Sequence, residues 1–288
     1  MKKISIGLPV YNEEKNIRNV LKNIINQKYK NKEIIISDNL SNDNTKKICL
    51  IYSRKYKFIK YYRQKKKIDP RKNYNFVLKK AVGEYFIWQA ADDSRSKNFL
   101  KENANFLNYN LQFVASTGVT VLDKHEFKKK NIIDFNLNGN LYSRLNNFFS
   151  NKWISRGVFD SLIRTKILKE FPFNNFKCYL GWDWVLIFYL ILKGKINRNL
   201  KSYAYFSSKG ISFRKDTIKM QRFDKPGNDF METIFPFKYL TKHIIFLINQ
   251  NSNISLKVIT YFFLITLNFI SGPIMILKNK IKIIKLYK

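Results

Sequence analysis

Four short apolar runs alternate with segments of helical periodicity in the first 88 residues, and this alternation limits the possible folds more than any other feature. In segment 13–27, Ile, Val and Leu recur three and four residues apart, as on one face of a helix. Gly83 follows a second helical segment, 73–82, and suits a helix C-terminus. Strands that alternate with helices predict an α/β fold with a Rossmann-like, mostly parallel central sheet flanked by helices. The predicted strands are Ile4–Leu8, Glu33–Ser37, Phe58–Tyr62 and Glu84–Trp88.

The middle of the chain has a mixed pattern. Phe113–Leu122 has the composition of a strand, and segment 196–206 is predicted to be another. Between them, 123–152 is a polar, Asn-rich insertion, and Asp183–Leu192 is a strongly apolar helix that starts at a carboxylate. In parallel α/β sheets, ligands bind beyond the carboxyl ends of the strands, so we expect the site at the polar loops that follow the first strands.

The composition excludes several classes of protein. Two cysteines and two histidines are too few for a disulfide framework or a His-rich metal centre, so any metal must be bound by carboxylates. The formal charge of +34 comes mainly from lysines dispersed along the chain, without a nucleic-acid-binding module, and we therefore expect no nucleic-acid partner. An anionic membrane surface or a phosphate-bearing acceptor fits the charge better. The first residues lack the apolar stretch of a signal peptide, which predicts a domain facing the cytoplasm.

Four motifs occur in order along the chain: PVYNEEKNI at 9–17, SDNLSNDNT at 37–45, GEYFIWQAADD at 83–93 and GWDW at 181–184. Together they resemble the family 2 glycosyltransferases, which have the GT-A fold, and the resemblance spans about residues 3–215. It implies an inverting enzyme whose donor is a nucleoside-diphosphate sugar, UDP-linked in our interpretation. We expect a glycosyltransferase domain over 1–230, in which 1–110 binds the nucleotide sugar and 111–230 the acceptor.

The resemblance assigns a divalent cation, Mg²⁺ or Mn²⁺, to Asp93 and a donor contact to Asp92. Such a cation neutralises the diphosphate as it leaves, and it prefers oxygen ligands. Ala91 departs from the family pattern, because it occupies the first position of a DxD motif and removes one carboxylate. The alternative interpretation is that Asp92, Asp93 and Ser94 form an ordinary helix-capping loop.

The loop after the first strand corresponds to the part of the family's site that lines the uracil and ribose pocket. Pro9, Tyr11, Asn12 and Glu13 are its donor-binding candidates, although Asn12 and Glu13 would also suit a helix cap. Asp38, at the end of the second strand, resembles the aspartate that accepts a hydrogen bond from the nucleobase. The alternative is a turn-forming aspartate.

Two further residues take roles from the resemblance. Arg71 corresponds to a basic residue that contacts the diphosphate, for which arginine is suited, with a solvated basic face as the alternative. Asp183 begins a helix where the family places the carboxylate that takes the proton from the acceptor hydroxyl. Its alternative role is that of an acidic residue favoured by the helix dipole. Trp182 and Trp184 flank it and suit either sugar stacking or the core.

The C-terminal segment, 231–288, is predicted to be a helical appendage. Val258–Leu277 is uncharged over 20 residues and long enough to span a bilayer, but a single span would send the basic tail to the far side. An in-plane or re-entrant helix on an anionic membrane fits better, and a buried helix covering the sheet is the alternative.

The combined prediction is transfer of one sugar to a hydroxyl of a surface glycan or a lipid-linked acceptor. The absence of a QxxRW motif from the C-terminal half favours single addition over processive synthesis. Segment 207–216 contains Lys209 and Arg214, but lacks the histidine found at this place in many relatives. The alternatives are a polyprenyl-phosphate sugar synthase and a non-catalytic nucleotide-sugar-binding protein.

Overall fold

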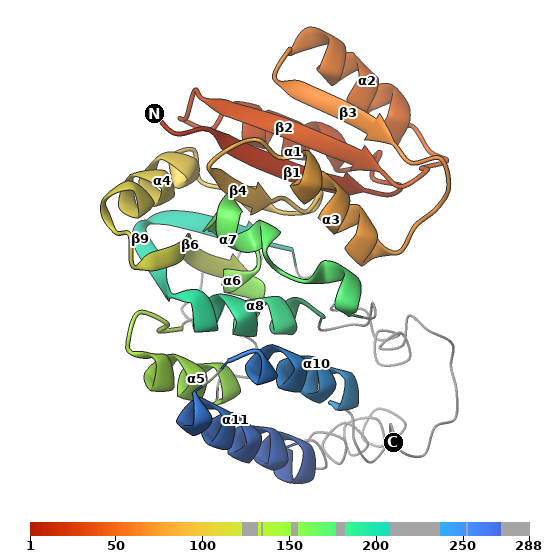
Figure 1. The fold of residues 1–288 in the computed structure, drawn as a ribbon. Coiled ribbons are helices and arrows are strands. Elements are labelled where there is room, and N and C mark those ends of the chain that lie inside the picture. Colours follow the sequence, from red (N-terminus) through yellow and green to blue (C-terminus); the bar gives the residue numbers. More distant parts are fainter. Residues whose placement is uncertain are drawn as a thin grey trace, which may run out of the picture.

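The computed structural model describes residues 1–122, 132–133, 135–150, 155–176, 182–207, 237–251 and 253–271. Within these residues one mixed sheet of nine strands forms the centre of the molecule, and helices cover both of its faces (Figure 1). The strand order is β3-β2-β1-β4-β8-β6-β9-β5, with β7 paired to β6.

The first half of the sheet is parallel. Its strands β1, β2, β3 and β4 pair in register, so that Val10 lies opposite Asp38 and Asp38 opposite Arg63. The carboxyl ends of these strands therefore meet at one edge of the sheet, as in other doubly wound α/β folds. The strands span Ile4–Val10 (β1), Lys32–Asp38 (β2), Ile59–Arg63 (β3) and Tyr85–Trp88 (β4).

The second half adds antiparallel strands. Strand β8 lies between β4 and β6 and runs antiparallel to both, whereas β6 and β9 are parallel to each other and β5 is antiparallel to β9. This arrangement brings the segment directly after β4 against the end of β9. The strands span Ser94–Arg95 (β5), Phe113–Leu122 (β6), Ile132–Ile133 (β7), Leu162–Arg164 (β8) and Lys195–Phe206 (β9).

One face of the sheet packs against helices α1 (Ile17–Ile25), α2 (Thr45–Lys55) and α4 (Phe99–Tyr109), which share one hydrophobic cluster. The other face carries α3 (Pro70–Lys80), α6 (Ser155–Val158), α7 (Thr165–Lys169) and α8 (Trp182–Lys193). Helix α8 is buried from Val185 to Ile191, because it lies between the sheet and a further helical layer.

That further layer consists of α5 (Leu141–Ser150), α10 (Lys238–Asn249) and α11 (Ile254–Thr266), which continues into a short π-helix, Leu267–Ser271. Buried residues of α10 and α11, such as Ile244 and Leu264, belong to the same hydrophobic cluster as Trp88. Figure 1 shows α11 as the outermost element, on the side of α5 and α10 away from the sheet. None of the helices in the described ranges has the length and hydropathy that a membrane crossing requires.

The structure confirms the α/β fold that the sequence predicts. The predicted strand Phe113–Leu122 has the same bounds in the structure, and the predicted helix Asp183–Leu192 corresponds to α8. The first helix is shorter than the 13–27 pattern: it spans Ile17–Ile25, and the N–H groups of Glu13 and Glu14 donate to Thr45 and Asp43. The insertion at 123–152 includes α5, whose Leu145 and Phe148 are buried despite the polar composition of the segment.

Gly83 permits a close approach of two backbone segments, and its substitution tests this part of the fold. A Cβ atom at Gly83 would lie 2.7 Å from the carbonyl oxygen of Lys3 and 2.8 Å from the backbone nitrogen of Ser5. We expect Gly83→Ala to lower the free energy of unfolding by about 1–3 kcal/mol, because backbone atoms must move to admit the methyl group. Urea denaturation measures the change. Val82→Ala, at an exposed neighbouring position, is the control, and an equal effect there would contradict the explanation.

Candidate functional site

Two loops meet beyond the carboxyl ends of β1 and β2 and are joined by hydrogen bonds. The backbone N–H of Asn12 donates to the Ser41 hydroxyl at 3.0 Å, and the Asn12 side-chain oxygen accepts from the N–H of Asn42 at 3.0 Å. Asn12 and Leu40 have positive φ angles of 54° and 64°. Such angles are uncommon outside glycine and concentrate at functional sites. The two loops therefore form one fixed wall of the site.

Acidic side chains extend this connection between the loops. The N–H of Glu13 donates to the Thr45 hydroxyl at 2.7 Å, and the N–H of Glu14 donates to the Asp43 carboxylate at 3.0 Å. The Glu14 carboxylate accepts from Asn44, also at 3.0 Å. Burial raises the pKa of Asp43, but hydrogen bonds from Thr45 and Glu14 outweigh it and lower the pKa below its ordinary value. These hydrogen bonds hold the loop after β1 against the loop after β2.

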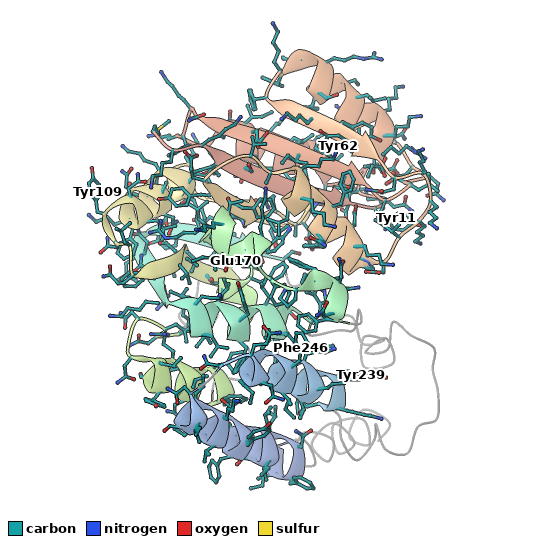
Figure 2. All side chains as sticks on the ribbon, in the orientation of Figure 1. Tyr11, Tyr62, Tyr109, Glu170, Tyr239 and Phe246 are labelled. Carbon is teal, nitrogen blue, oxygen red and sulfur yellow. The ribbon has the colours of Figure 1, made fainter. Side chains whose placement is uncertain are left out.

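Tyr11 is exposed at this wall, and Pro9 precedes it within β1. The Tyr11 ring is 39% exposed and carries the Lys67 ammonium 4.0 Å above its centroid, and Figure 2 shows it at the edge of the sheet. Pro9 is half-buried. Helix α1 has Asn16 at its N-cap position, so Asn12 and Glu13 do not cap it. The structure therefore does not show the capping alternative for Asn12 and Glu13, and the donor-pocket role of this loop stays a prediction.

Asp38 is fully buried and has several partners within the protein. One carboxylate oxygen accepts from the N–H of Ser41 at 2.8 Å, and the other accepts from the Tyr61 hydroxyl at 2.6 Å. The Arg63 guanidinium lies 3.6 Å from the second oxygen. The hydrogen bond from Ser41 is the contact expected of a turn-forming aspartate, which is the alternative interpretation of Asp38. Contact with a nucleobase stays a prediction for this residue.

Arg71 lies on the first turn of α3 and is buried. Its guanidinium donates to the carbonyl oxygen of Phe173 and lies 4.0 Å from the Asp69 carboxylate. The alternative of a solvated basic face is therefore wrong for this residue. The diphosphate contact stays a prediction.

Asp92 and Asp93 follow β4 in a turn that leads into β5. Asp92 is exposed, while Asp93 is half-buried and accepts a 3.2 Å hydrogen bond from the N–H of Ser207, the residue after β9. Helix α4 begins at Phe99 with Asn98 at its N-cap, so neither aspartate caps a helix. Ser207, the first residue of segment 207–216, thus lies beside Asp93, whereas Lys209 and Arg214 lie outside the described residues.

Asp160 and Asp183 complete an acidic cluster with these two residues. Burial raises the pKa of Asp93 well above its ordinary value, and the charges of Asp160 and Asp92 raise it further. Burial raises the pKa of Asp160 to about 7; Arg95 opposes this shift, and Asp183 and Asp92 add to it. Burial followed by the charges of all four carboxylates also raises the pKa of Tyr74. The four carboxylates therefore act on one another, although Asp183 lies 90 positions after Asp93.

Arg95 contacts the backbone of one member of this cluster and acts through its charge on two of them. Its buried guanidinium donates to the carbonyl oxygen of Trp88 at 2.9 Å and to that of Asp160 at 3.1 Å. Its own backbone is held by Asn23 of α1, which both donates to and accepts from Arg95. The positive charge stabilises the ionised forms of Asp93 and Asp160. A single cation thus connects the end of β4 with the segment after α6.

Aromatic rings fix the start of α8, where Asp183 lies. Trp182 packs edge-on against Phe159 at 5.2 Å and against Tyr74 at 5.8 Å, while Phe159 stacks on Trp88 at 4.8 Å. Trp184 stacks on Phe237 at 6.3 Å instead. Both tryptophans are half-buried and contribute to packing, and the contacts of Trp182 join α8 to the residue next to Asp160.

The sequence motifs do not predict three residues of this cluster and its surroundings: Asp160, Arg95 and Tyr74. Asp160 lies outside all four motifs, and Arg95 lies two residues beyond the third. A cue available in the sequence was that Asp160 is one of only 20 acidic residues in a chain with 54 basic ones. Its place in the cluster depends on the pairing of β8 with β4 and β6, which brings residue 160 back to the sheet edge.

The residues present fit a divalent cation in part. Asp93 supplies a carboxylate whose charge is opposed by its acidic neighbours, and this repulsion favours an added cation. Among the described residues, however, no group of three or more His, Cys, Asp or Glu is placed to hold a metal. Mg²⁺ often takes only one or two protein carboxylates and completes its coordination with substrate phosphates and water.

The fold is similar to that of solved glycosyltransferases. A structure from S. aureus, TarS 1–349 in complex with UDP-GlcNAc, matches with a TM-score of 0.59 and 18% identity, covering 88% of this chain and 77% of that chain. The mannosyltransferase PcManGT from Pyrobaculum calidifontis, in complex with GDP-Man and Mn²⁺, matches with a TM-score of 0.54 and 15% identity, covering 84% and 63%. The fold of this chain is therefore that of the GT-A-type glycosyltransferases.

Sequence relatives are also glycosyltransferases. The cholesterol galactosyltransferase of Borreliella burgdorferi is 26% identical over 244 residues, covering 81% of this chain and 67% of the relative. The GalNAc(5)-diNAcBac-PP-undecaprenol beta-1,3-glucosyltransferase of Campylobacter jejuni is 34% identical over 109 residues, covering 36% and 35%. Two other bacterial relatives are matched over 37% and 45% of their length. The model of glycosyl transferase family 2 matches residues 5–171, and this chain belongs to that family.

The raised pKa of Asp160 predicts a pH-dependent stability. An unfolded aspartate titrates near pH 3.9, so the stabilisation from the protonated native carboxyl is complete below about pH 4 and is lost as the pH rises through about 7. Asp160→Asn removes this loss. We expect the free energy of unfolding of the variant, relative to that of the wild type, to rise by roughly 1–2 kcal/mol from about pH 4 to about pH 7. Solvent screening keeps this figure below the full value of the pKa shift.

Urea denaturation across this pH range, with a chelator present, measures the difference. Glu102→Gln, on α4, is the control and is expected to follow the wild type. Parallel pH profiles for Asp160→Asn and the wild type would contradict the prediction.

Proposed function

We propose that this enzyme transfers a single sugar, with inversion, from a UDP-linked donor to a hydroxyl group of a surface glycan or a lipid-linked acceptor. The observation that carries the proposal is the acidic cluster of Asp92, Asp93, Asp160 and Asp183. Its first two members follow β4, which pairs in parallel with β1, so they share a sheet edge with the loop at residues 11–13. The name of the Campylobacter jejuni relative supports an undecaprenol-linked acceptor, and the S. aureus structure supports a UDP donor. The proposed location is the cytoplasmic face of the cell membrane.

The donor is assigned to the wall formed by the first two loops. The residues assigned to the nucleoside pocket are Pro9, Tyr11, Asn12 and Glu13. Their loop is fixed against the second loop, and the Tyr11 ring is exposed. Asp38 acts at the nucleobase end, where its carboxylate orients Ser41 and Tyr61. Arg71 and Asp92 are assigned to the remaining contacts with the donor, on the side of the diphosphate.

Asp93 is assigned to the divalent cation, Mg²⁺ or Mn²⁺. When bound, the cation would neutralise charge on the departing diphosphate. The Ser207 N–H and the Gln89 side chain hold the turn in place: Ser207 donates to the Asp93 carboxylate, and Gln89 donates to the Asp93 carbonyl oxygen at 2.9 Å.

Asp183 is assigned as the general base. The acceptor oxygen attacks the anomeric carbon, the bond from that carbon to the diphosphate oxygen breaks, and the acceptor proton passes to the Asp183 carboxylate. The diphosphate leaves from the face opposite the attack, which inverts the anomeric configuration. Burial raises the pKa of Asp160 to about 7, and protonation of this carboxyl would lower the negative charge that surrounds Asp183.

Thermal stabilisation by nucleotides tests the donor site. We expect UDP with Mn²⁺ to stabilise the wild type by about 2.7 kcal/mol at a hundredfold excess over Kd, because it binds only the folded state. GDP, dTDP and CDP serve as comparisons, and each is measured with and without Mn²⁺. Asp93→Asn is expected to lose the cation-dependent part, while Glu102→Gln keeps it. No stabilisation by any of these nucleotides would refute the donor site.

Substitution of Asp183 tests the general base. We expect Asp183→Asn to lower kcat for sugar transfer by about 10²–10⁴-fold, because proton removal from the acceptor is lost. Stabilisation by UDP with Mn²⁺ should remain at the wild-type level. Transfer at the wild-type rate would remove Asp183 from the chemistry, and loss of UDP stabilisation would instead assign it to donor binding.

A further inference from the structure

Helix α11 exposes an unusual concentration of apolar side chains. In the described part of the chain, seven of the sixteen exposed large apolar residues lie on α11 and the π-helix that continues it, with exposed fractions from 37% to 75%. Most of them follow one another at spacings of three and four residues, which places them along one stripe of the helix. The α11 stripe consists of Ile254, Val258, Tyr261, Phe262, Ile265, Phe269 and Ile270.

The opposite face of α11 is attached to the protein. Leu256, Thr260 and Leu264 are buried, and the Phe263 ring stacks on Phe149 of α5 at 4.8 Å. Asn268 donates to the Thr241 hydroxyl of α10 at 2.8 Å. Because α5 and α10 cover one side of the helix, lipid can surround only the outer side, and the helix can enter a bilayer only in the plane of its interface.

The charge of the C-terminal segment selects the partner. Residues 237–288 contain no Asp or Glu and eight lysines, at positions 238, 242, 257, 278, 280, 282, 285 and 288. Among the described residues, Lys238 and Lys242 lie on α10 and Lys257 lies on α11 itself. Positive charge on the helices that carry an exposed apolar stripe complements a surface that is apolar below and negative above. An anionic lipid bilayer has this arrangement, and it attracts lysines that lie near its surface.

We propose that the α11 stripe is the membrane-docking surface of this enzyme and lies flat in the interface of an anionic bilayer. The stripe is the surface through which the membrane location proposed above would be reached. Only the biological role of this docking rests on the proposed function. Docking through the outermost helix holds the catalytic domain at the bilayer through α10, α5 and α8. A lipid-linked acceptor would then be reached without release of the enzyme from the membrane.

Co-sedimentation of the full chain with vesicles tests the proposal. Vesicles of phosphatidylcholine with phosphatidylglycerol are compared with vesicles of phosphatidylcholine alone. The wild type should bind the anionic vesicles preferentially, and added salt should weaken the binding. Phe262→Gln with Phe269→Gln should weaken it by roughly tenfold or more, because two apolar side chains no longer enter the interface.

The matched control is Tyr109→Gln with Leu111→Gln, which removes two exposed apolar residues at a distant place, seen for Tyr109 in Figure 2. It should bind vesicles as the wild type does. Circular dichroism and stabilisation by UDP with Mn²⁺, measured on the same samples, separate lipid binding from folding and from donor binding. Lipid binding without nucleotide binding would contradict only the proposed function.

Three results would overturn the assignment of the stripe. The first is a wild type that does not bind anionic vesicles, and the second is an α11 variant that binds them as strongly as the control. The third is a wild type that forms dimers in solution, measured by analytical ultracentrifugation, which the α11 variant converts to monomers. A second copy of the chain would then be the partner of the stripe.

Discussion

The geometry of the site depends on the hydrogen bonds of the buried Arg95 guanidinium. It donates to the carbonyl oxygens of Trp88 and Asp160 and so joins the end of β4 to the segment that precedes β8. A buried cation is costly unless it is paired, and here the charges of Asp93 and Asp160 oppose the effect of burial. Without this cation the carboxylates at the edge of the sheet would repel one another without compensation.

The site combines residues from the two halves of the chain for a related reason. The parallel half of the sheet ends in the loop wall and the Asp92–Asp93 turn, whereas the base candidate Asp183 begins a helix of the second half. Aromatic packing of Trp182 against Phe159 and Tyr74 sets the start of that helix. Aromatic rings in contact prefer edge-to-face and offset-stacked arrangements, and these edge-on contacts fix the start of α8.

The alternation of apolar runs and helical segments was enough to predict the α/β fold, and the bounds of Phe113–Leu122 were correct. The same reasoning described 123–152 as a polar insertion, although Leu145 and Phe148 of α5 are buried in it. A short helix with two or three buried residues has little periodicity to detect. The structure removed the capping alternative for Asp93, whereas Asp38 shows the turn contact that its sequence context allows.

By itself, the sequence determined the order of the elements, the polar loops after the first strands and the family motifs, because these depend on residues close together along the chain. Only the tertiary structure decided that Asp160 joins the site, through a contact to Arg95 across 65 positions, and that Arg71 is buried against Phe173 across 102. It also decided which side of the apolar C-terminal helix faces outward, since α5 and α10 cover the other. Such contacts follow from strand pairing and helix packing, which local patterns leave open.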